Sequence, residues 1–266
     1  FARCRGIEIE SGHHNFNYWI PGNVYGKTHP EYFPVINGKR KAMNPAKRSG
    51  PWNPCISNPG IPKLVAEYAD EYFKKHPERI GLPLGVNDGG GDCQCEKCLY
   101  EFKTTGNQYA RFYNTAAKVL AKKYPDKVAA FIAYSRCSYA VPKGVKMEPN
   151  VLVEATGMGV SAFREMKRWQ DVGARHFGLY DYISSIGSSF ITPRYYPRLM
   201  GKLWKDAMKN YNLEIMWVEY IPASLIFSAP RQYVLDNIAW NPDVDTEALL
   251  DDYFTSMYAE AGMKVK

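Results

Sequence analysis

The chain has 266 residues and a formal net charge of +7, and it is long enough to bury one substantial core. Its lysines and arginines are scattered, so a nucleic-acid surface is not expected, and no apolar run reaches the ~20 residues that span a bilayer. Composition does not shift along the sequence, so residues 1–266 are expected to form a single domain.

Short apolar stretches alternate with longer amphipathic segments along the chain. We expect strands at residues 2–10, 80–88, 127–135, 151–156, 176–184 and 214–222. Apolar residues at three- and four-residue spacing predict helices at residues 62–75, 107–124, 161–172 and 196–211. This alternation of strand and helix predicts a parallel sheet with right-handed crossovers.

The predicted fold class is α/β, in the form of a (β/α)8 barrel of the TIM type. Six predicted strands do not close an eight-stranded barrel, and Phe1 already lies within an apolar stretch, so we expect a fragment that lacks the first strands. Pro142, Gly144 and Pro149 leave no room for a full crossover helix between residues 135 and 151.

Carboxylates at predicted strand ends are the candidate catalytic groups, because a barrel takes such groups from the carboxyl ends of different strands. Asp88 follows Asn87 and precedes three glycines, where the chain can turn sharply and a ligand can approach closely. Asp88 can also simply cap this turn. Glu219 lies in an otherwise apolar strand, where a buried carboxylate needs a partner such as Arg136 or Arg194.

We expect Asp88 and Glu219 to be the principal catalytic pair, with Asp181 as the next candidate. Asp181 stands between two tyrosines in a predicted strand, and strand alternation points it away from both. Only one of these two sets can face the barrel mouth unless the strand bends at its exit. Glu154 also lies in an otherwise apolar strand, where a buried carboxylate needs a partner, although it precedes the end of its strand by more residues than Glu219 does.

Aromatic side chains accompany these acids near the predicted strand ends. Flat surfaces beside carboxylates and amides suit sugar rings, which have apolar faces and polar edges, although each aromatic residue can also belong to the core. The residues that we expect to contact a substrate are His13, His14, Asn87, Tyr134, Tyr180, Tyr182 and Trp217. Because adjacent side chains point in different directions, at most one of the two histidines is expected to face the pocket.

Three of the six cysteines follow the glycines directly, as Cys93, Cys95 and Cys98. These thiols can bind zinc with a fourth ligand such as Cys137 or a histidine, form a disulfide in an exported protein, or stay reduced in a tight turn. A complete paired CxxC framework is missing, so no metal is assigned to the expected site. As structural elements these cysteines would fix the loop that carries Asp88. No phosphate loop, HExxH or GxSxG motif occurs, and no cofactor is expected.

Several short motifs occur in order along nearly the whole chain, at residues 12–15, 29–33, 38–40, 55–59, 87–90 with 93–98, 195–197, 219 and 240–243. Their order resembles the bacterial family of domains of unknown function 4838, which includes glycoside hydrolase family 163, endo-acting β-N-acetylglucosaminidases. The most specific element is the Asn-Asp-Gly-Gly run followed by CxCxxC. The resemblance implies a (β/α)8-type catalytic domain that acts on a glycan and is secreted, periplasmic or attached to the cell surface.

The resemblance also suggests hydrolysis of β-linked N-acetylglucosamine by a substrate-assisted, retaining mechanism. One carboxylic acid would protonate the leaving oxygen while the substrate's acetamide attacks, and a second carboxylate would stabilise the acetamide. The chain has no contiguous Asp-Glu pair at a predicted strand end, so the arrangement of β-hexosaminidases cannot be transferred to it. The alternatives are another glycosidase, such as an α-glucuronidase-like enzyme in which Arg136 or Arg194 binds a sugar carboxylate, and a non-catalytic carbohydrate-binding module.

Overall fold

The computed structural model describes residues 14–41, 43–44, 50–157, 160–182, 196–219 and 225–265. The predicted strand at residues 2–10 lies outside these residues, as do His13 and Arg194.

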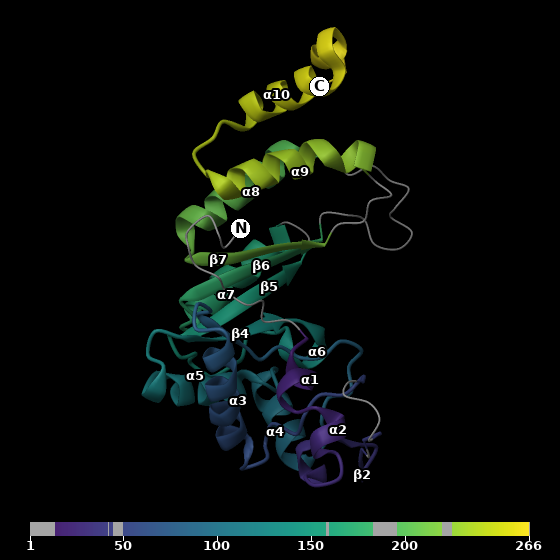
Figure 1. Cartoon of the computed structure of the whole chain (residues 1–266), viewed down its shortest axis with the longest axis vertical. Coiled ribbons are helices and arrows are strands. Elements are labelled where there is room, and N and C mark those ends of the chain that lie inside the picture. The colour runs from purple at the N-terminus through teal and green to yellow at the C-terminus, as the bar shows by residue number, and fades with distance from the viewer. Residues whose placement is uncertain are drawn as a thin grey trace.

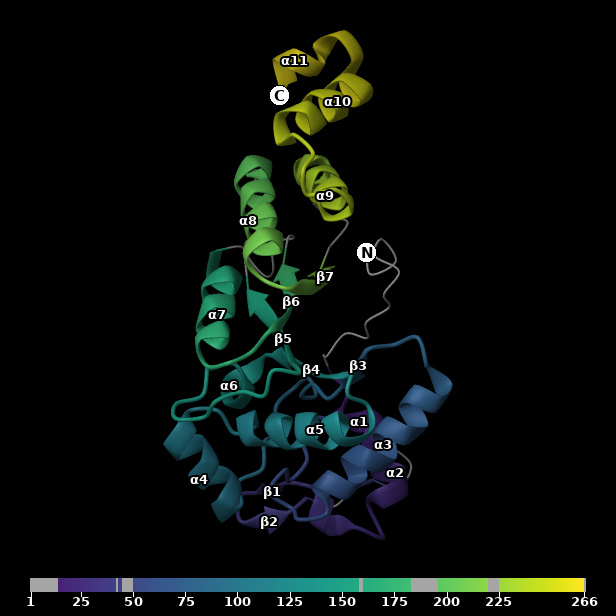
Figure 2. The same ribbon diagram turned by 90° about the vertical axis from the view of Figure 1, so that its left-hand side faces the viewer.

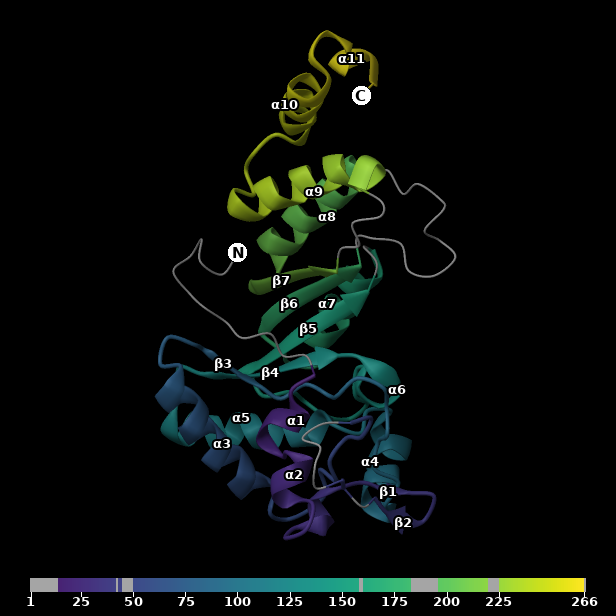
Figure 3. The same cartoon turned by 45° about the vertical axis from the view of Figure 1, so that its right-hand side comes forward.

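A five-stranded parallel sheet forms the centre of the molecule (Figure 1). Its strands are β3 (Gly81–Pro83), β4 (Val128–Ala133), β5 (Val151–Gly157), β6 (His176–Tyr182) and β7 (Leu213–Glu219), in that spatial order. Each crossover therefore leads to the next strand in the same direction, as in a barrel, whereas the strand order of a doubly wound sheet reverses. The sheet curls into a half barrel (Figure 3), and the described residues do not close the complete (β/α)8 barrel that we expected.

Helices cover the outer side of this half barrel (Figure 2). α3 (Ile61–Lys75) packs on α5 (Ala110–Lys123), and α5 packs against β4. α7 (Val160–Asp171) packs on β5 and β6, and α8 (Pro197–Asn210) packs against α9 (Leu225–Trp240). All four predicted helices are thus confirmed, with ends that differ from the predicted ones by at most three residues.

The amphipathic pattern of α5 explains how a helix is fixed on the sheet. Its buried face includes Phe112, Tyr113 and Leu120. Lys122 and Lys123 lie in its last turn, where positive charge interacts favourably with the negative end of the helix dipole. The ring of Tyr113 stacks on that of Phe131 in β4, with centroids 3.7 Å apart. Burial of such large side chains stabilises the fold by roughly 1.5–3 kcal/mol each.

Strand side chains alternate between the helix-covered face and the concave inner face of the half barrel. Phe131 and Val153 face the helices and belong to the main core. Ala130, Leu152 and Ile215 pack in a separate small apolar cluster on the inner face, near the amino ends of the strands. Polar and aromatic side chains occupy the inner face nearer the carboxyl ends.

A smaller layer lies on the side of the sheet that carries β3 and β4. It contains α1 (Phe16–Trp19), α2 (Gly22–Tyr25), α4 (Glu96–Thr105) and a hairpin of β1 (Val35–Ile36) with β2 (Lys39–Arg40). None of these elements was predicted from the sequence. Figure 3 shows this layer below the sheet and the carboxyl ends of the strands on the side of α6 (Ser135–Ser138).

The C-terminal helices lie beyond α9, at the end of the molecule opposite α1 and α2 (Figure 1). They are α10 (Thr246–Tyr258) and the short α11 (Gly262–Val265). The side chain of Asp245 caps α10 by accepting hydrogen bonds from the backbone N–H groups of Glu247 and Ala248. Within the described ranges, no helix is both long enough and apolar enough to cross a membrane.

Two connections bear on the site. α6 is the only helix within residues 134–150, all of which are described, so the prediction that no full crossover helix fits there is confirmed. β3 ends at Pro83, five residues earlier than the predicted strand end at Asp88. Beyond β3, the carbonyl of Gly85 accepts hydrogen bonds from the N–H groups of Asn15 and Phe16, so the chain reaches Asp88 as a loop.

Candidate functional site

Three of the predicted site residues meet at the carboxyl ends of β3 and β4. The hydroxyl of Tyr134 donates a hydrogen bond of 3.1 Å to Oδ1 of Asp88. The ring of His14 lies edge-on to that of Tyr134, with centroids 5.3 Å apart, and its Nδ1 donates to the carbonyl of Val86 over 2.8 Å. Because Asp88 is exposed, these three side chains form a polar group that solvent can reach.

The backbone at this group adopts an uncommon conformation. His14 and Ser135 have φ angles of 51° and 67°, in the left-handed region that non-glycine residues rarely adopt. Such conformations cost roughly 1–3 kcal/mol and cluster at functional sites. Two of the four described non-glycine residues with positive φ thus belong to or adjoin the pair His14 and Tyr134.

Asn87 is buried and ties the start of the loop to its neighbours. Its backbone N–H donates to Oδ1 of Asn53 over 2.8 Å, and its Nδ2 donates to the carbonyl of Trp52 over 2.7 Å. Its Oδ1 accepts from the N–H of Asn17 over 3.1 Å. These contacts let Asn87 hold the chain next to Asp88, and its expected contact with a substrate stays a prediction.

The loop after Asp88 is held at both ends. Residues 89–91 all have positive φ, which glycine adopts without steric cost. Asp92 then accepts hydrogen bonds from Nδ2 of Asn53 over 3.0 Å and from the hydroxyl of Tyr109 over 2.6 Å. Asp92 is therefore an anchor of the loop, and Asn53 links it to Asn87.

An aromatic group occupies the inner face near the carboxyl ends of β6 and β7. The ring of Tyr180 lies 5.3 Å from that of Tyr182 and 6.4 Å from that of Trp217, and the planes of Tyr180 and Trp217 differ by 24°. Trp217 keeps 46% of its surface exposed. An exposed, flat aromatic surface of this kind suits the apolar face of a sugar ring.

Glu154 is fully buried in β5, deeper than this aromatic group. It lies opposite Gly178, and a Cβ at Gly178 would come within 3.2 Å of Cγ of Glu154. Gly178 therefore leaves the space that the Glu154 side chain occupies. Because a buried carboxylate is costly unless it is hydrogen-bonded, Glu154 is a further candidate, and its placement could have been predicted from strand alternation.

Asp181 lies on the other face of the sheet from the aromatic group. It is 1% exposed, and the strand register places it beside Gly157 and Val218, in the row that faces the helices. From Gly178 to Tyr182 the pairing with β7 is regular, so Asp181 keeps the orientation that strand alternation gives it. The structure thus separates Asp181 from Tyr180 and Tyr182.

Glu219 is the last residue of β7 and the register partner of Tyr182. Its side chain lies outside the described part of the structure. Arg136, which we considered as its partner, lies over the ring of Phe102 in α4, at 5.3 Å from the ring centroid.

The fold and the group at the strand ends can be compared with known families. A sequence profile of the family described as Domain of unknown function (DUF4838) matches residues 3–266. The chain belongs to this family. Comparisons with curated proteins and with solved structures give no match.

Four thiols of this DUF4838 domain gather beside the loop, and their sulfur atoms lie within 4.8 Å of one another, at Cys55, Cys93, Cys95 and Cys98. Cys55 takes the fourth position, for which the sequence suggested Cys137 or a histidine. Hydrogen bonds from the thiols of Cys93 and Cys98 lower the pKa of Cys55. Burial and the nearby Asp92 raise the pKa of Cys137 to about 12.

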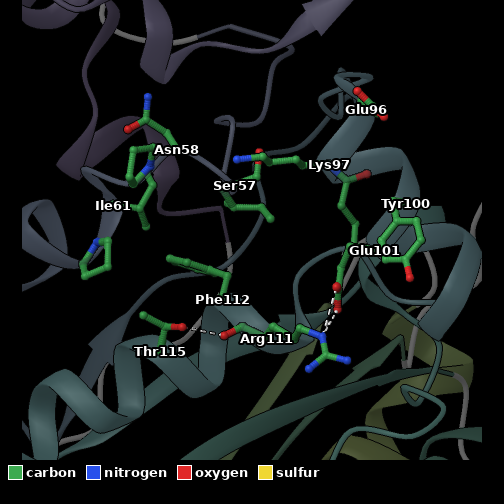
Figure 4. A pocket seen from close by; sticks show the side chains of 14 residues that line it. Ser57, Asn58, Ile61, Glu96, Lys97, Tyr100, Glu101, Arg111, Phe112 and Thr115 are labelled. Carbon is green, nitrogen blue, oxygen red and sulfur yellow. Dashed lines mark hydrogen bonds and ion pairs between the residues drawn. The ribbon is translucent and has the colours of Figure 1, made fainter.

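A cavity of about 550 Å³ lies between α3, α4 and α5 of the DUF4838 domain (Figure 4). Arg111 and Glu101 form an ion pair of 3.0 Å on its wall, and burial raises the pKa of Glu101. Ile61 and Phe112 contribute apolar surface. None of the predicted site residues lines this cavity, so the group at the carboxyl ends of the strands remains the candidate site.

Proposed function

We propose that this DUF4838 domain hydrolyses β-linked N-acetylglucosamine in glycans and retains the configuration at the anomeric carbon. The motif resemblance to glycoside hydrolase family 163 supports the reaction and the substrate. A parallel half barrel with acids and aromatic rings at its carboxyl ends supports a carbohydrate site. The observation that carries the proposal is the exposed Trp217 beside Tyr180 on the inner face.

Asp88 is the carboxylate that orients the acetamide of the substrate. It accepts hydrogen bonds from the hydroxyl of Tyr134, over 3.1 Å, and from the N–H of Gly89, over 2.9 Å. Two donors aimed at one oxygen fix the orientation of the carboxylate, and a fixed negative charge stabilises the positive charge that develops as the acetamide oxygen attacks. The attack is intramolecular, which can lower the barrier by several kcal/mol.

Glu219 is the proposed general acid, which protonates the leaving oxygen. Its position at the end of β7 is one of the strand ends from which barrels take catalytic groups. Asp181 faces the helix layer, and Glu154 lies buried below the aromatic group, so neither is assigned a step. The substrate is a glycan, and an exported protein fits this role.

The test is to incubate the full-length protein with a panel of N-glycans and aryl glycosides and to identify the products by mass. We expect cleavage at β-linked N-acetylglucosamine, with a β-configured product in the first NMR spectra. Asp88→Asn should abolish most turnover. Asp126→Asn is the matched control, because Asp126 is exposed and precedes β4 at the opposite rim of the sheet.

Two outcomes would replace the proposal. Glycan binding without turnover, unchanged in Asp88→Asn, would identify a carbohydrate-binding module. Preferred cleavage of uronides, or an inverted product, would identify another kind of glycosidase.

A further inference from the structure

The four thiols at Cys55, Cys93, Cys95 and Cys98 have the dimensions of a tetrahedral metal site. Four sulfur atoms at ~2.3 Å from a zinc ion lie about 3.8 Å apart along the edges of the tetrahedron. The sulfur atoms of Cys55 and Cys95 are 3.7 Å apart, and no two sulfur atoms of the group are more than 4.8 Å apart. All four thiolates can therefore reach one ion after shifts of about 1 Å or less.

We propose that this cluster binds one structural zinc ion through four cysteine thiolates. A soft, all-sulfur, tetrahedral ligand set selects zinc or iron, and zinc is the usual occupant of closed Cys4 sites. The four ligands leave no open position, so the ion would hold the structure and take no part in chemistry. The inference does not depend on the proposed glycosidase activity.

The surroundings of the sulfur atoms suit thiolate ligands. The backbone N–H of Val35 donates to the sulfur of Cys93 over 3.3 Å, and the hydroxyl of Ser57 lies 3.4 Å from the sulfur of Cys95. Cys95 is the N-cap of α4, and Cys98 lies in its first turn, where the helix dipole favours negative charge. These contacts are the outer-sphere hydrogen bonds and charges that metal thiolates require.

The cluster joins three segments that have little other regular structure. Cys55 precedes α3, residues 93–98 enter α4, and the β1–β2 hairpin is attached through Val35, whose carbonyl accepts a 2.7 Å hydrogen bond from the N–H of Gln94. The loop that carries Asp88 ends at this point. A bound ion would therefore fix the loop in a part of the chain where α4 buries only Cys98 and Thr105.

A disulfide is the competing arrangement for these cysteines. It requires a sulfur separation of about 2.05 Å, and every described cysteine is free. A disulfide would also leave two of the four thiols without a role.

The experiment is metal analysis of the full-length protein, purified without added metal or chelator. We expect about one zinc ion per chain, lost on treatment with a strong chelator together with a fall in the thermal midpoint. Refolding the metal-free protein with cobalt(II) should give the intense visible bands of tetrahedral cobalt thiolate. The five cysteines of the described residues should all react in the denatured, chelated chain, since none of them forms a disulfide.

Cys98→Ser should lose the zinc and the cobalt bands, whereas Cys137→Ser should keep both. Cys137 is the matched control because it is buried and lies outside the cluster. Wild-type protein that takes up neither zinc nor cobalt after reduction and refolding would overturn the proposal, as would a disulfide within the cluster. Iron in place of zinc would overturn the assignment of the metal. Because wild-type protein alone can give these results, the test stands even if Cys98→Ser does not fold.

Discussion

The hydroxyl of Tyr134 donates a hydrogen bond to Asp88 over 3.1 Å, and this contact joins the ends of two neighbouring strands. Asp88 follows β3 and Tyr134 follows β4, so parallel pairing of these strands brings the two residues together. The second hydrogen bond, from Gly89, fixes the same carboxylate oxygen. Two donors thus orient the Asp88 carboxylate, as its proposed role in electrostatic preorganisation requires.

Removing the hydrogen bond from Tyr134 to Asp88 should slow the proposed reaction while the aromatic ring at position 134 stays in place. Tyr134→Phe keeps the ring beside His14 but loses the donor to Asp88. Hydrogen bonds to charged groups contribute about 1.5–3 kcal/mol, so we expect kcat to fall at least about tenfold. Steady-state kinetics check this, with Tyr139→Phe as a half-exposed control tyrosine. Equal kcat values for the two variants would show that Tyr134 does not position Asp88.

Replacing either proposed catalytic carboxylate should reduce turnover far more than Tyr134→Phe does. Asp88→Asn and Glu219→Gln should each reduce turnover by at least ~100-fold, the typical loss for an acid or base group. Thermal unfolding and circular dichroism should show a retained fold, and Asp126→Asn should keep near-normal rates. A near-normal rate for Asp88→Asn or for Glu219→Gln removes that residue from the mechanism.

The exposed tryptophan should affect binding more than chemistry. Trp217→Ala should weaken glycan binding about tenfold, because aromatic contacts contribute ~0.5–1.5 kcal/mol beyond burial, and Trp217→Phe should recover part of the loss. Trp240→Ala is the control, since Trp240 is also exposed but lies at the end of α9. Calorimetry on an inactive Asp88→Asn background measures the affinities. If Trp217→Ala binds as well as Trp240→Ala, the aromatic group is not the sugar site.

Neighbouring glycines of the loop should differ in their tolerance of a side chain. Both Gly90 and Gly91 have positive φ, so alanine is strained at either. A Cβ at Gly91 would also lie 2.5 Å from the carbonyl oxygen of Pro51, whereas nothing lies within 4 Å at Gly90. Gly90→Ala should cost about 1 kcal/mol of unfolding free energy, and Gly91→Ala should cost clearly more. Chemical denaturation measures the unfolding free energy of each variant. Equal losses in Gly90→Ala and Gly91→Ala would contradict the close contact between Gly91 and Pro51.

Much of the sheet and its outer helices could be predicted because burial dictates their sequence pattern. β4 and β5 are almost continuously apolar, and α5 repeats its apolar residues at helical spacing. α4 was missed because only Cys98 and Thr105 are buried in it, although Gly106 in the left-handed conformation marks its end. α9 was missed because Pro230 lies inside it.

The site could be predicted only in part, because distant contacts leave no local pattern. Asp88 and Tyr134 were recognisable as residues at strand ends, but their hydrogen bond depends on the pairing of β3 with β4. From the sequence, the amide of Asn87 was expected to bind a ligand. Only the fold shows that this amide hydrogen-bonds to the backbone of Trp52 and Asn17. The fourth thiol, Cys55, is remote in sequence from the other three, so spacing alone could not select it.

The requirement for the acetamide of the substrate tests the central claim most directly. Two aryl glycosides that differ only at the 2-position, a β-N-acetylglucosaminide and a β-glucoside, should be compared in one assay with a thiazoline mimic of the cyclic intermediate. We predict that only the N-acetylglucosaminide is turned over and that the thiazoline inhibits strongly, because the intramolecular attack needs the acetamide oxygen. Equal turnover of both glycosides, with no inhibition by the thiazoline, would contradict the account.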